Sequence, residues 1–155
     1  MDVVWCAVGM VKQTLTGTLR VALPPSRAFR LFTAVGERAW VDGWDPRFPV
    51  PVPDDAEPGT VFETDADGHH GTWMVVDRDG DLGIRYARVV TGRDAGTVTV
   101  RLGPSDGHSL VTVTYDLTPL SRGGADWLER FAADYPSFLA GWADAIERHL
   151  ATLPR

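Results

Sequence analysis

The chain has 155 residues, of which 44% are hydrophobic and 10% aromatic, and its formal net charge is −6. This length suits one domain, and the apolar content is sufficient for a packed core, so the composition excludes an intrinsically disordered chain. The basic residues are scattered singly. This argues against nucleic-acid binding and against an anionic membrane surface, because both kinds of partner require clustered Lys or Arg.

The N-terminal segment carries little structural information. Cys6 is the single cysteine and cannot form an intramolecular disulfide. Residues 1–11 are largely apolar, but they are too few to span a bilayer and lack the basic start of a signal peptide. We expect residues 1–13 to be an N-terminal extension, with Met10 as an alternative start, ahead of a single domain over residues 14–152. We expect the protein to be cytoplasmic.

The first part of the domain mixes one strand with helical and irregular segments. Residues 14–23 alternate apolar and polar side chains, which predicts a strand. Pro24–Pro25 ends that strand and starts a short helix, and a second short helix is expected within Gly36–Trp44. The segment 45–59 contains five prolines, which predict a long irregular loop of the kind that often has a function.

The second part predicts a sheet and a covering helix. Short turns separate five further apolar runs, so these strands should form an antiparallel meander. The runs are residues 60–64, 70–77, 82–90, 97–102 and 109–117. An apolar stripe over residues 125–151 predicts a long helix on one face of the sheet, kinked by Pro136. The predicted fold is α+β: a curved antiparallel sheet of about six strands around a long C-terminal helix, with two short helices after the first strand. The gap between sheet and helix predicts an apolar pocket.

Two local motifs resemble functional sites but are predicted to be turns. Gly103–Gly107 matches G-x-S-x-G, yet it lies between two strands rather than at the strand-to-helix elbow of a hydrolase. Asp77–Asp81 lacks the glycine and glutamate positions that a calcium loop needs. The sequence has no HExxH or CxxC pattern, so we expect neither a metal site nor a cofactor.

Two polar positions stand out as candidates for the pocket. His69 and His70 begin a strand, where neighbouring side chains face opposite sides, so one of them could face the pocket; we select His70. Arg88 follows Ile84 and Tyr86 on one strand face. If that face is internal, Arg88 needs a carboxylate or a ligand anion as its partner; if the strand is an edge or bulged, Arg88 lies outside.

The aromatic residues supply most of the remaining candidates. Trp44 and Phe48 lie at or within the proline-rich segment and are expected to plug or gate the pocket mouth. For Phe62 and Trp73, core packing is the alternative to a pocket role. The full set of candidate cavity residues is Trp40, Trp44, Phe48, Phe62, His70, Trp73, Tyr86, Arg88, Tyr115, Phe131, Tyr135 and Phe138.

The order of segments over residues 14–152 resembles the Bet v 1/START-like (SRPBCC) superfamily, in particular the branch with bacterial polyketide cyclases and co-chaperone-like proteins. The segments that carry the resemblance are Pro25–Phe32, Gly36–Trp40, Gly59–Phe62, Gly71–Trp73, Thr112–Leu117 and Phe138–Trp142. The resemblance implies the helix-grip fold and a cavity that holds a hydrophobic small molecule. It implies no single activity, and it supplies no shared catalytic motif.

Three functions follow as hypotheses. The first is binding of a hydrophobic or aromatic small molecule, with Tyr86, Arg88 or Tyr115 orienting its polar end. The second is a metal-free enzyme of the cyclase, aromatase or dehydratase type, in which a Tyr, His or Arg assists proton transfer. The third is a protein-interaction module with a filled interior and an exposed apolar patch. The absence of an evident acid–base pair favours the first, with a monomer or weak homodimer and no nucleic-acid or membrane partner.

Overall fold

Residues 10–154 are described by a computed structural model with six strands, one long helix and three short helical segments. The elements are β1 (Gln13–Val21), α1 (Pro25–Ala28), η1 (Phe29–Phe32), η2 (Gly36–Ala39), β2 (Val61–Ala66), β3 (His69–Asp79), β4 (Gly83–Val90), β5 (Asp94–Ser105), β6 (His108–Pro119) and α2 (Arg122–Ala151). Residues 1–9 of the predicted N-terminal extension, including Cys6, lie outside the described residues.

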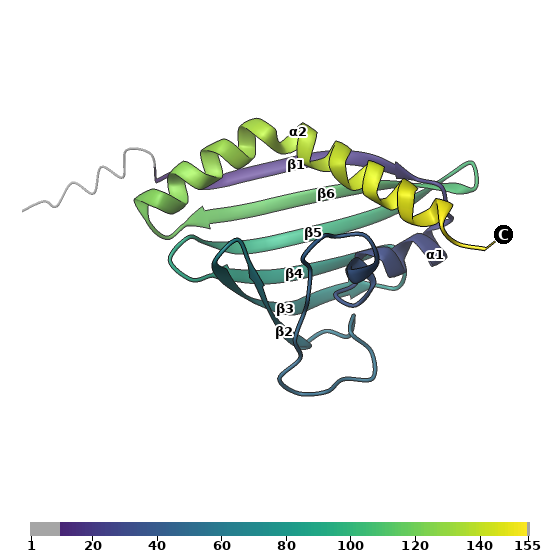
Figure 1. Ribbon diagram of the computed structural model, residues 1–155, viewed down its shortest axis with the longest axis horizontal. Coiled ribbons are helices and arrows are strands. Elements are labelled where there is room, and N and C mark those ends of the chain that lie inside the picture. The colour runs from purple at the N-terminus through teal and green to yellow at the C-terminus, as the bar shows by residue number, and fades with distance from the viewer. Residues whose placement is uncertain (1–9, 155) are drawn as a thin grey trace, which may run out of the picture.

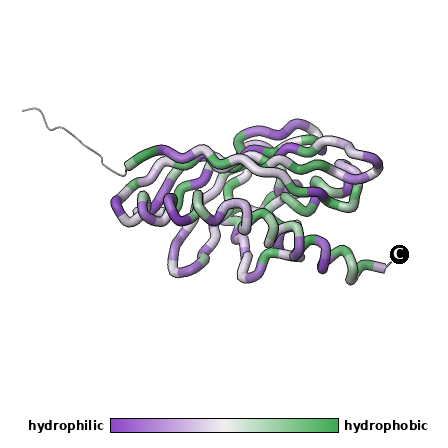
Figure 2. The backbone as a smooth tube through the Cα atoms, turned by 90° about the horizontal axis from the view of Figure 1, so that it is seen from above, coloured by the Kyte–Doolittle hydropathy of each residue, from purple (hydrophilic) through white to green (hydrophobic). Residues whose placement is uncertain are grey.

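The six strands form one antiparallel sheet in the order β1-β6-β5-β4-β3-β2. The predicted meander is therefore confirmed, and β1 closes the order beside β6 (Figure 1). Figure 2 shows hydrophilic and hydrophobic residues alternating along the strands, as expected for a sheet with one covered face. On β6, for example, Val111 and Val113 are fully buried, whereas Thr112 and Thr114 are half-buried.

Tight turns join several of the strands. The β2–β3 turn places Asp67 and Gly68 at φ values of 52° and 75°, and the β5–β6 turn places Asp106 and Gly107 at 51° and 80°. Two consecutive positive φ values are typical of type I′ turns, which match the twist of a hairpin. The segment Gly103–Gly107 is therefore a hairpin turn, as predicted, and not a nucleophile elbow.

Helix α2 lies over the β1 side of the sheet (Figure 1). The close approach depends on Gly17 of β1, where a Cβ atom would lie only 2.5 Å from the Cδ1 atom of Leu139. Pro136 lies inside the helix, and Figure 1 shows the helix axis changing direction near its middle. Because α2 packs beside β1, the inner face of the central strands is left for other segments to cover.

The η1–η2 region and the proline-rich loop supply that second cover. The predicted second helix is only a 3₁₀ turn, η2. Its first residue is Gly36, where a Cβ atom would clash with the Arg30 carbonyl oxygen, so the position requires glycine. The loop pairs briefly with β2, through Arg47 and Glu63. Trp44 fixes the preceding segment, since its Nε1 donates to the Ala34 carbonyl at 2.7 Å.

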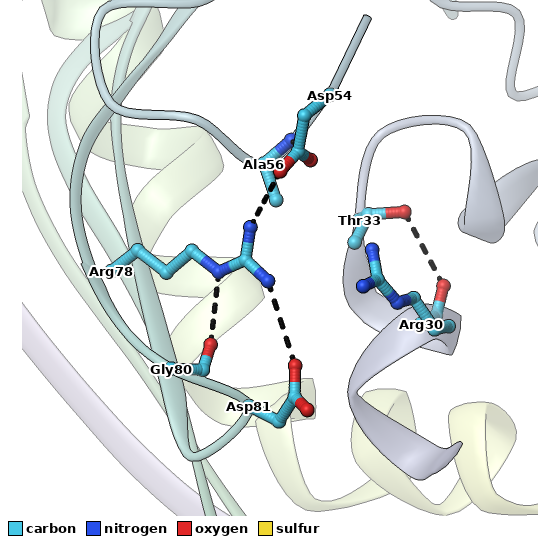
Figure 3. Close-up of polar contacts among 7 residues, drawn as sticks. All are labelled: Arg30, Thr33, Asp54, Ala56, Arg78, Gly80 and Asp81. Atoms are coloured by element: carbon cyan, nitrogen blue, oxygen red, sulfur yellow. Dashed lines mark hydrogen bonds and ion pairs between the residues drawn. The ribbon is translucent and has the colours of Figure 1, made fainter. Parts of the chain in front are cut away.

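The Arg78 side chain links the proline-rich loop to the β3–β4 turn through hydrogen bonds (Figure 3). Its guanidinium donates to Asp54 at 2.9 Å, to the Gly80 carbonyl at 2.9 Å and to Asp81 at 3.5 Å. The same group lies 4.8 Å from the centre of the Phe29 ring. The amide of Ala56 and the Arg78 guanidinium together hold the pKa of Asp54 below its usual range. The calcium-like segment Asp77–Asp81 is thus a turn stabilised by an arginine.

Candidate functional site

A cavity of about 220 Å³ lies between the inner face of the sheet, the η2–Trp44 segment and α2. This is somewhat below the ~300–1,000 Å³ typical of small-molecule sites, so the cavity suits a small ligand. It reaches solvent at the β2–β3 turn, because the exposed residues Asp67 and His69 belong to its wall. The lining comprises Glu37, Val41, Trp44, Phe62, Thr64, Ala66, Asp67, His69, Gly71, Trp73, Tyr86, Arg88, Val90, Arg93, Val98, Val100, Tyr115, Trp127, Phe131, Phe138 and Trp142.

Aromatic rings form the wall on the β2–β3 side. Phe62 and Trp73 stack with ring centres 5.6 Å apart, and Trp44 meets both rings edge-on. The polar atoms of these indoles are bonded elsewhere, since Trp73 Nε1 donates to Thr64 at 3.0 Å and Trp44 Nε1 donates to the Ala34 carbonyl. The rings therefore present apolar surface to a ligand.

Helix α2 supplies the opposite aromatic wall. Its lining residues Trp127, Phe131, Phe138 and Trp142 recur at helical spacing, so they share one face of the helix. Phe131 lies 5.2 Å from Tyr115 of β6, measured between ring centres, which joins the helix wall to the sheet. The α2 wall carries no charged side chain.

Arg88 points inward, and the alternative of an edge or bulged position is excluded. Its side chain is only 7% exposed, and Nη2 donates to Asp94 at 2.7 Å. Asp94 is fully buried and also accepts from Arg93 at 2.8 Å. The Arg88 guanidinium lies between the Trp73 and Tyr115 rings, at 5.4 and 5.6 Å from their centres. Its Nε has no hydrogen-bond partner among the described residues. The required carboxylate is therefore supplied by the protein itself.

The three tyrosines differ in what their hydroxyl groups contact. The Tyr86 hydroxyl donates to the Phe32 carbonyl at 2.7 Å, and the Tyr135 hydroxyl donates to the Val113 carbonyl at 2.6 Å. The Tyr115 hydroxyl makes no hydrogen bond to another described residue, while its ring lines the cavity. Burial raises the pKa of all three phenols, so they stay neutral at physiological pH.

Like Arg93, Trp127 and Trp142 of the same lining, Glu37 is a residue that sequence reasoning missed. Its carboxyl belongs to the cavity wall, and burial raises its pKa well above the usual range. The residue as a whole has intermediate exposure. Its side chain forms neither a hydrogen bond nor an ion pair with another described residue. No repeating pattern pointed to it, since η2 ends at Ala39 and the chain continues irregularly to Trp44.

Four of the candidate residues lie away from the cavity wall. Trp40 donates through Nε1 to the Leu31 carbonyl and packs on Phe32 and Trp142. Phe48 packs behind Phe62, on the loop side. Tyr135 faces β1 beside Gly17. The remaining candidates, Trp44, Phe62, Trp73, Tyr86, Arg88, Tyr115, Phe131 and Phe138, line the cavity.

His70 is the fourth residue outside the cavity, and its neighbour His69 lines the mouth instead. His70 bridges two carboxylates on the outer side, with Nδ1 3.0 Å from Asp65 and Nε2 3.3 Å from Glu63. The choice between the two histidines depended on strand register, which places His69 opposite Ala66 and His70 opposite Asp65. Arg93 and Trp127 complete the mouth, with the guanidinium 3.6 Å above the centre of the Trp127 ring.

We expect His70 to titrate above the ordinary histidine pKa, because Asp65 and Glu63 favour its protonated form. The raised pKa means that the stabilisation is present at low pH and is lost as the pH rises through the value in the folded protein. An NMR titration of the imidazole protons measures this directly. Replacing Asp65 by Asn should lower the pKa of His70, whereas Asp106→Asn, at the far hairpin, should not. An unshifted pKa in the wild type would contradict the pairing.

Removing the Glu37 charge should stabilise the fold at neutral and alkaline pH. Because burial raises the pKa of Glu37, the ionised carboxylate opposes folding. The protein is therefore most stable below the unfolded-state pKa of about 4.3, and this stability is lost as the pH rises through the folded-state pKa. The Glu37→Gln variant should match the wild type near pH 4 and exceed it by roughly 1–3 kcal/mol at pH 8. Urea unfolding at both pH values measures this difference. Glu129→Gln, on the exposed face of α2, is the control, and equal behaviour of the two variants would contradict the burial of Glu37.

Solved structures share this architecture across nearly the whole chain. A protein called Mll3558 from Rhizobium loti is 22% identical, with a TM-score of 0.62 over 87% of this chain and 97% of its own. Norcoclaurine synthase from Thalictrum flavum is 13% identical, with a TM-score of 0.65 over 94% and 90% of the two chains. Ara h 8.0201 is 17% identical, with a TM-score of 0.62 over 92% and 100%. The protein has the Bet v 1/START-like helix-grip fold.

Sequence comparison adds no closer relationship. No protein-family model matches the chain, and no curated protein matches it. Within residues 10–154, no helix has both the length and the apolar character needed to cross a bilayer. In the same part of the chain, no three His, Cys, Asp or Glu side chains gather as a metal site would require. Because the sequence identities to the solved structures are low, the shared helix-grip fold does not indicate an activity. Function therefore has to be argued from the cavity.

Proposed function

We propose that the protein binds a hydrophobic or aromatic small molecule in the cavity between the sheet and α2. The observation that carries this proposal is an interior space walled by aromatic rings, in which the indole nitrogens of Trp44 and Trp73 are already bonded to the protein. Such a wall offers a ligand apolar contact over its faces, and burying a ring there yields about 25 cal/mol per Å² of apolar surface. The third hypothesis, an interaction module, requires a filled interior and is less well supported.

The neighbouring folds support the same proposal at a coarser level. Norcoclaurine synthase is by name an enzyme, and DynU16 is described as a putative protein of the dynemicin biosynthetic locus. The DynU16 match covers 90% of this chain but 47% of the other, at 15% identity and a TM-score of 0.62. A small-molecule cavity on this fold is therefore consistent with both binding and catalysis.

A second candidate is a metal-free enzyme of the cyclase or aromatase type. Glu37 and Tyr115 favour it, because a buried carboxyl and an unbonded phenol line the same cavity. A carboxyl whose pKa is raised by burial can act as a general acid or base near neutral pH. Turnover lost in Glu37→Gln with ligand affinity retained would distinguish this function from binding alone.

A thermal-shift screen tests the proposed binding. The panel contains fatty acids, sterols, flavonoids and polycyclic phenols. A ligand present at 100 times its Kd stabilises the folded state by about 2.7 kcal/mol, which raises the Tm by roughly 5–10 °C for a domain of this size. We expect bicyclic and tricyclic aromatic compounds to give the largest shifts, given the cavity volume. No shift across the whole panel would contradict a ligand-binding role.

A further inference from the structure

The charged side chains around the cavity are not paired one to one. Arg88 and Arg93 both donate to Asp94, so the two cations share one buried anion. Glu37 lines the same cavity but has no cation beside it among the described residues: no ion pair involves it, and burial alone governs its pKa. A buried carboxyl without a counter-charge is costly to ionise, and a positively charged partner removes that cost.

The groups that face Glu37 come from several elements. The negative charge of Glu37 helps to raise the pKa of two phenols, Tyr86 on β4 and Tyr115 on β6. Arg88, 5.6 Å from the centre of the Tyr115 ring, acts on this phenol in the opposite direction and lowers its pKa. From α2 the wall offers only aromatic rings, and Asp67, His69 and Arg93 lie at the mouth. Arg88 and Arg93 are both paired with Asp94, and no described residue forms an ion pair with Glu37.

The surroundings of Glu37 suit one chemical class of partner. Indole and phenyl faces attract organic cations through their quadrupoles, by about 0.5–2 kcal/mol per contact when water is excluded. Trp44 lines the cavity together with Glu37, and the rings of Phe138 and Trp142 line it from α2. An unpaired carboxyl in an aromatic enclosure is the combination that recognises a protonated amine.

We propose that the cavity selects small organic cations: molecules with an apolar aromatic body and a protonated amine that pairs with the Glu37 carboxylate. This inference rests on the proposed binding function and specifies its ligand class. A bound ammonium favours the ionised carboxyl, so binding releases a proton from Glu37. Affinity for the amine therefore rises with pH until the amine itself deprotonates, near pH 10 for an alkylamine.

Isothermal titration calorimetry with a matched pair of probes tests the inference. The cation is 2-(2-naphthyl)ethylamine and the neutral isostere is 2-(2-naphthyl)ethanol, each titrated at pH 6 and pH 8. We expect the wild type to bind the amine at least 10-fold more tightly than the alcohol at pH 8, with a smaller preference at pH 6. Proton release should appear as a dependence of the measured heat on the ionisation enthalpy of the buffer.

Two variants locate the effect. Glu37→Gln keeps the shape of the side chain and should abolish the amine preference while it retains the alcohol affinity. Glu129→Gln should behave as the wild type. Equal affinity for both probes in the wild type at pH 8 would overturn the cation preference and leave the proposed binding function intact. If neither probe binds at millimolar concentration to a protein that also fails the thermal-shift panel, both proposals are wrong.

Discussion

Replacing Asp94 by Asn should destabilise the protein by about 3–5 kcal/mol, the largest effect we expect from a single conservative change. Asp94 is fully buried and accepts from Arg88 at 2.7 Å and from Arg93 at 2.8 Å. The amide keeps the volume of the carboxylate but not its charge, so Arg88 would remain buried without a counter-ion. Thermal or urea unfolding measures the loss, which corresponds to a fall in Tm of roughly 6–20 °C.

Two further variants separate this charge effect from general damage to the strand. Asp79→Asn breaks the ion pair between Asp79 and Arg101, whose side chains are 65% and 60% exposed, respectively. This change should cost at most about 1 kcal/mol of stability. The double variant Asp94→Asn/Arg88→Met removes the Arg88 charge that Asp94→Asn leaves buried without a counter-ion. It should therefore restore part of the lost stability. If Asp94→Asn costs no more than Asp79→Asn, the buried pair does not support the fold in the way we describe.

Filling the cavity should abolish ligand binding without unfolding the protein. Val98 lies on β5 between Tyr86 and Tyr115 and lines the cavity, so Val98→Phe would place a ring in the space that a ligand occupies. We expect affinity for any ligand from the screen to fall at least 100-fold. The cost in stability should stay within about 1–3 kcal/mol, because the added ring enters space that is already empty.

The neighbouring position supplies the control. Thr97 precedes Val98 on the same strand and faces the outer side of the sheet, so Thr97→Phe adds the same ring outside the cavity. This variant should bind ligands as the wild type does. Unchanged affinity in Val98→Phe, measured by calorimetry, would place the ligand site elsewhere and would contradict the proposed function.

The helix-grip architecture was predictable because it depends on local patterns. The alternation of apolar residues specified the strands, and Asp-Gly pairs such as Asp67-Gly68 and Asp106-Gly107 specified hairpin turns. Helical spacing specified α2. The element ends were less accurate, as β5 extends to Asp94–Ser105 beyond the predicted 97–102, because ladder pairing with β6 continues past the apolar run.

The candidate site was predictable where a side chain's direction follows from strand or helix spacing. The internal position of Tyr86 follows from alternation along β4, and those of Phe131 and Phe138 from the face of α2, whereas alternation left Arg88 either inside or outside. Trp40 and Phe48 could not be placed in this way, because they lie in irregular segments without a repeating direction. They pack behind the wall rather than in it.

The sequence by itself determined the order of elements, the covered face of the sheet and the aromatic character of the space beneath α2, since each of these follows from periodicity over a few neighbouring residues. Only the tertiary structure decided which charges meet. Arg88 finds Asp94 across the β4–β5 turn, while Glu37 reaches the same cavity from η2 and meets no cation within the described chain. Electrostatic partners depend on how separate elements lie relative to one another in space, and the pattern within any one element does not contain those distances.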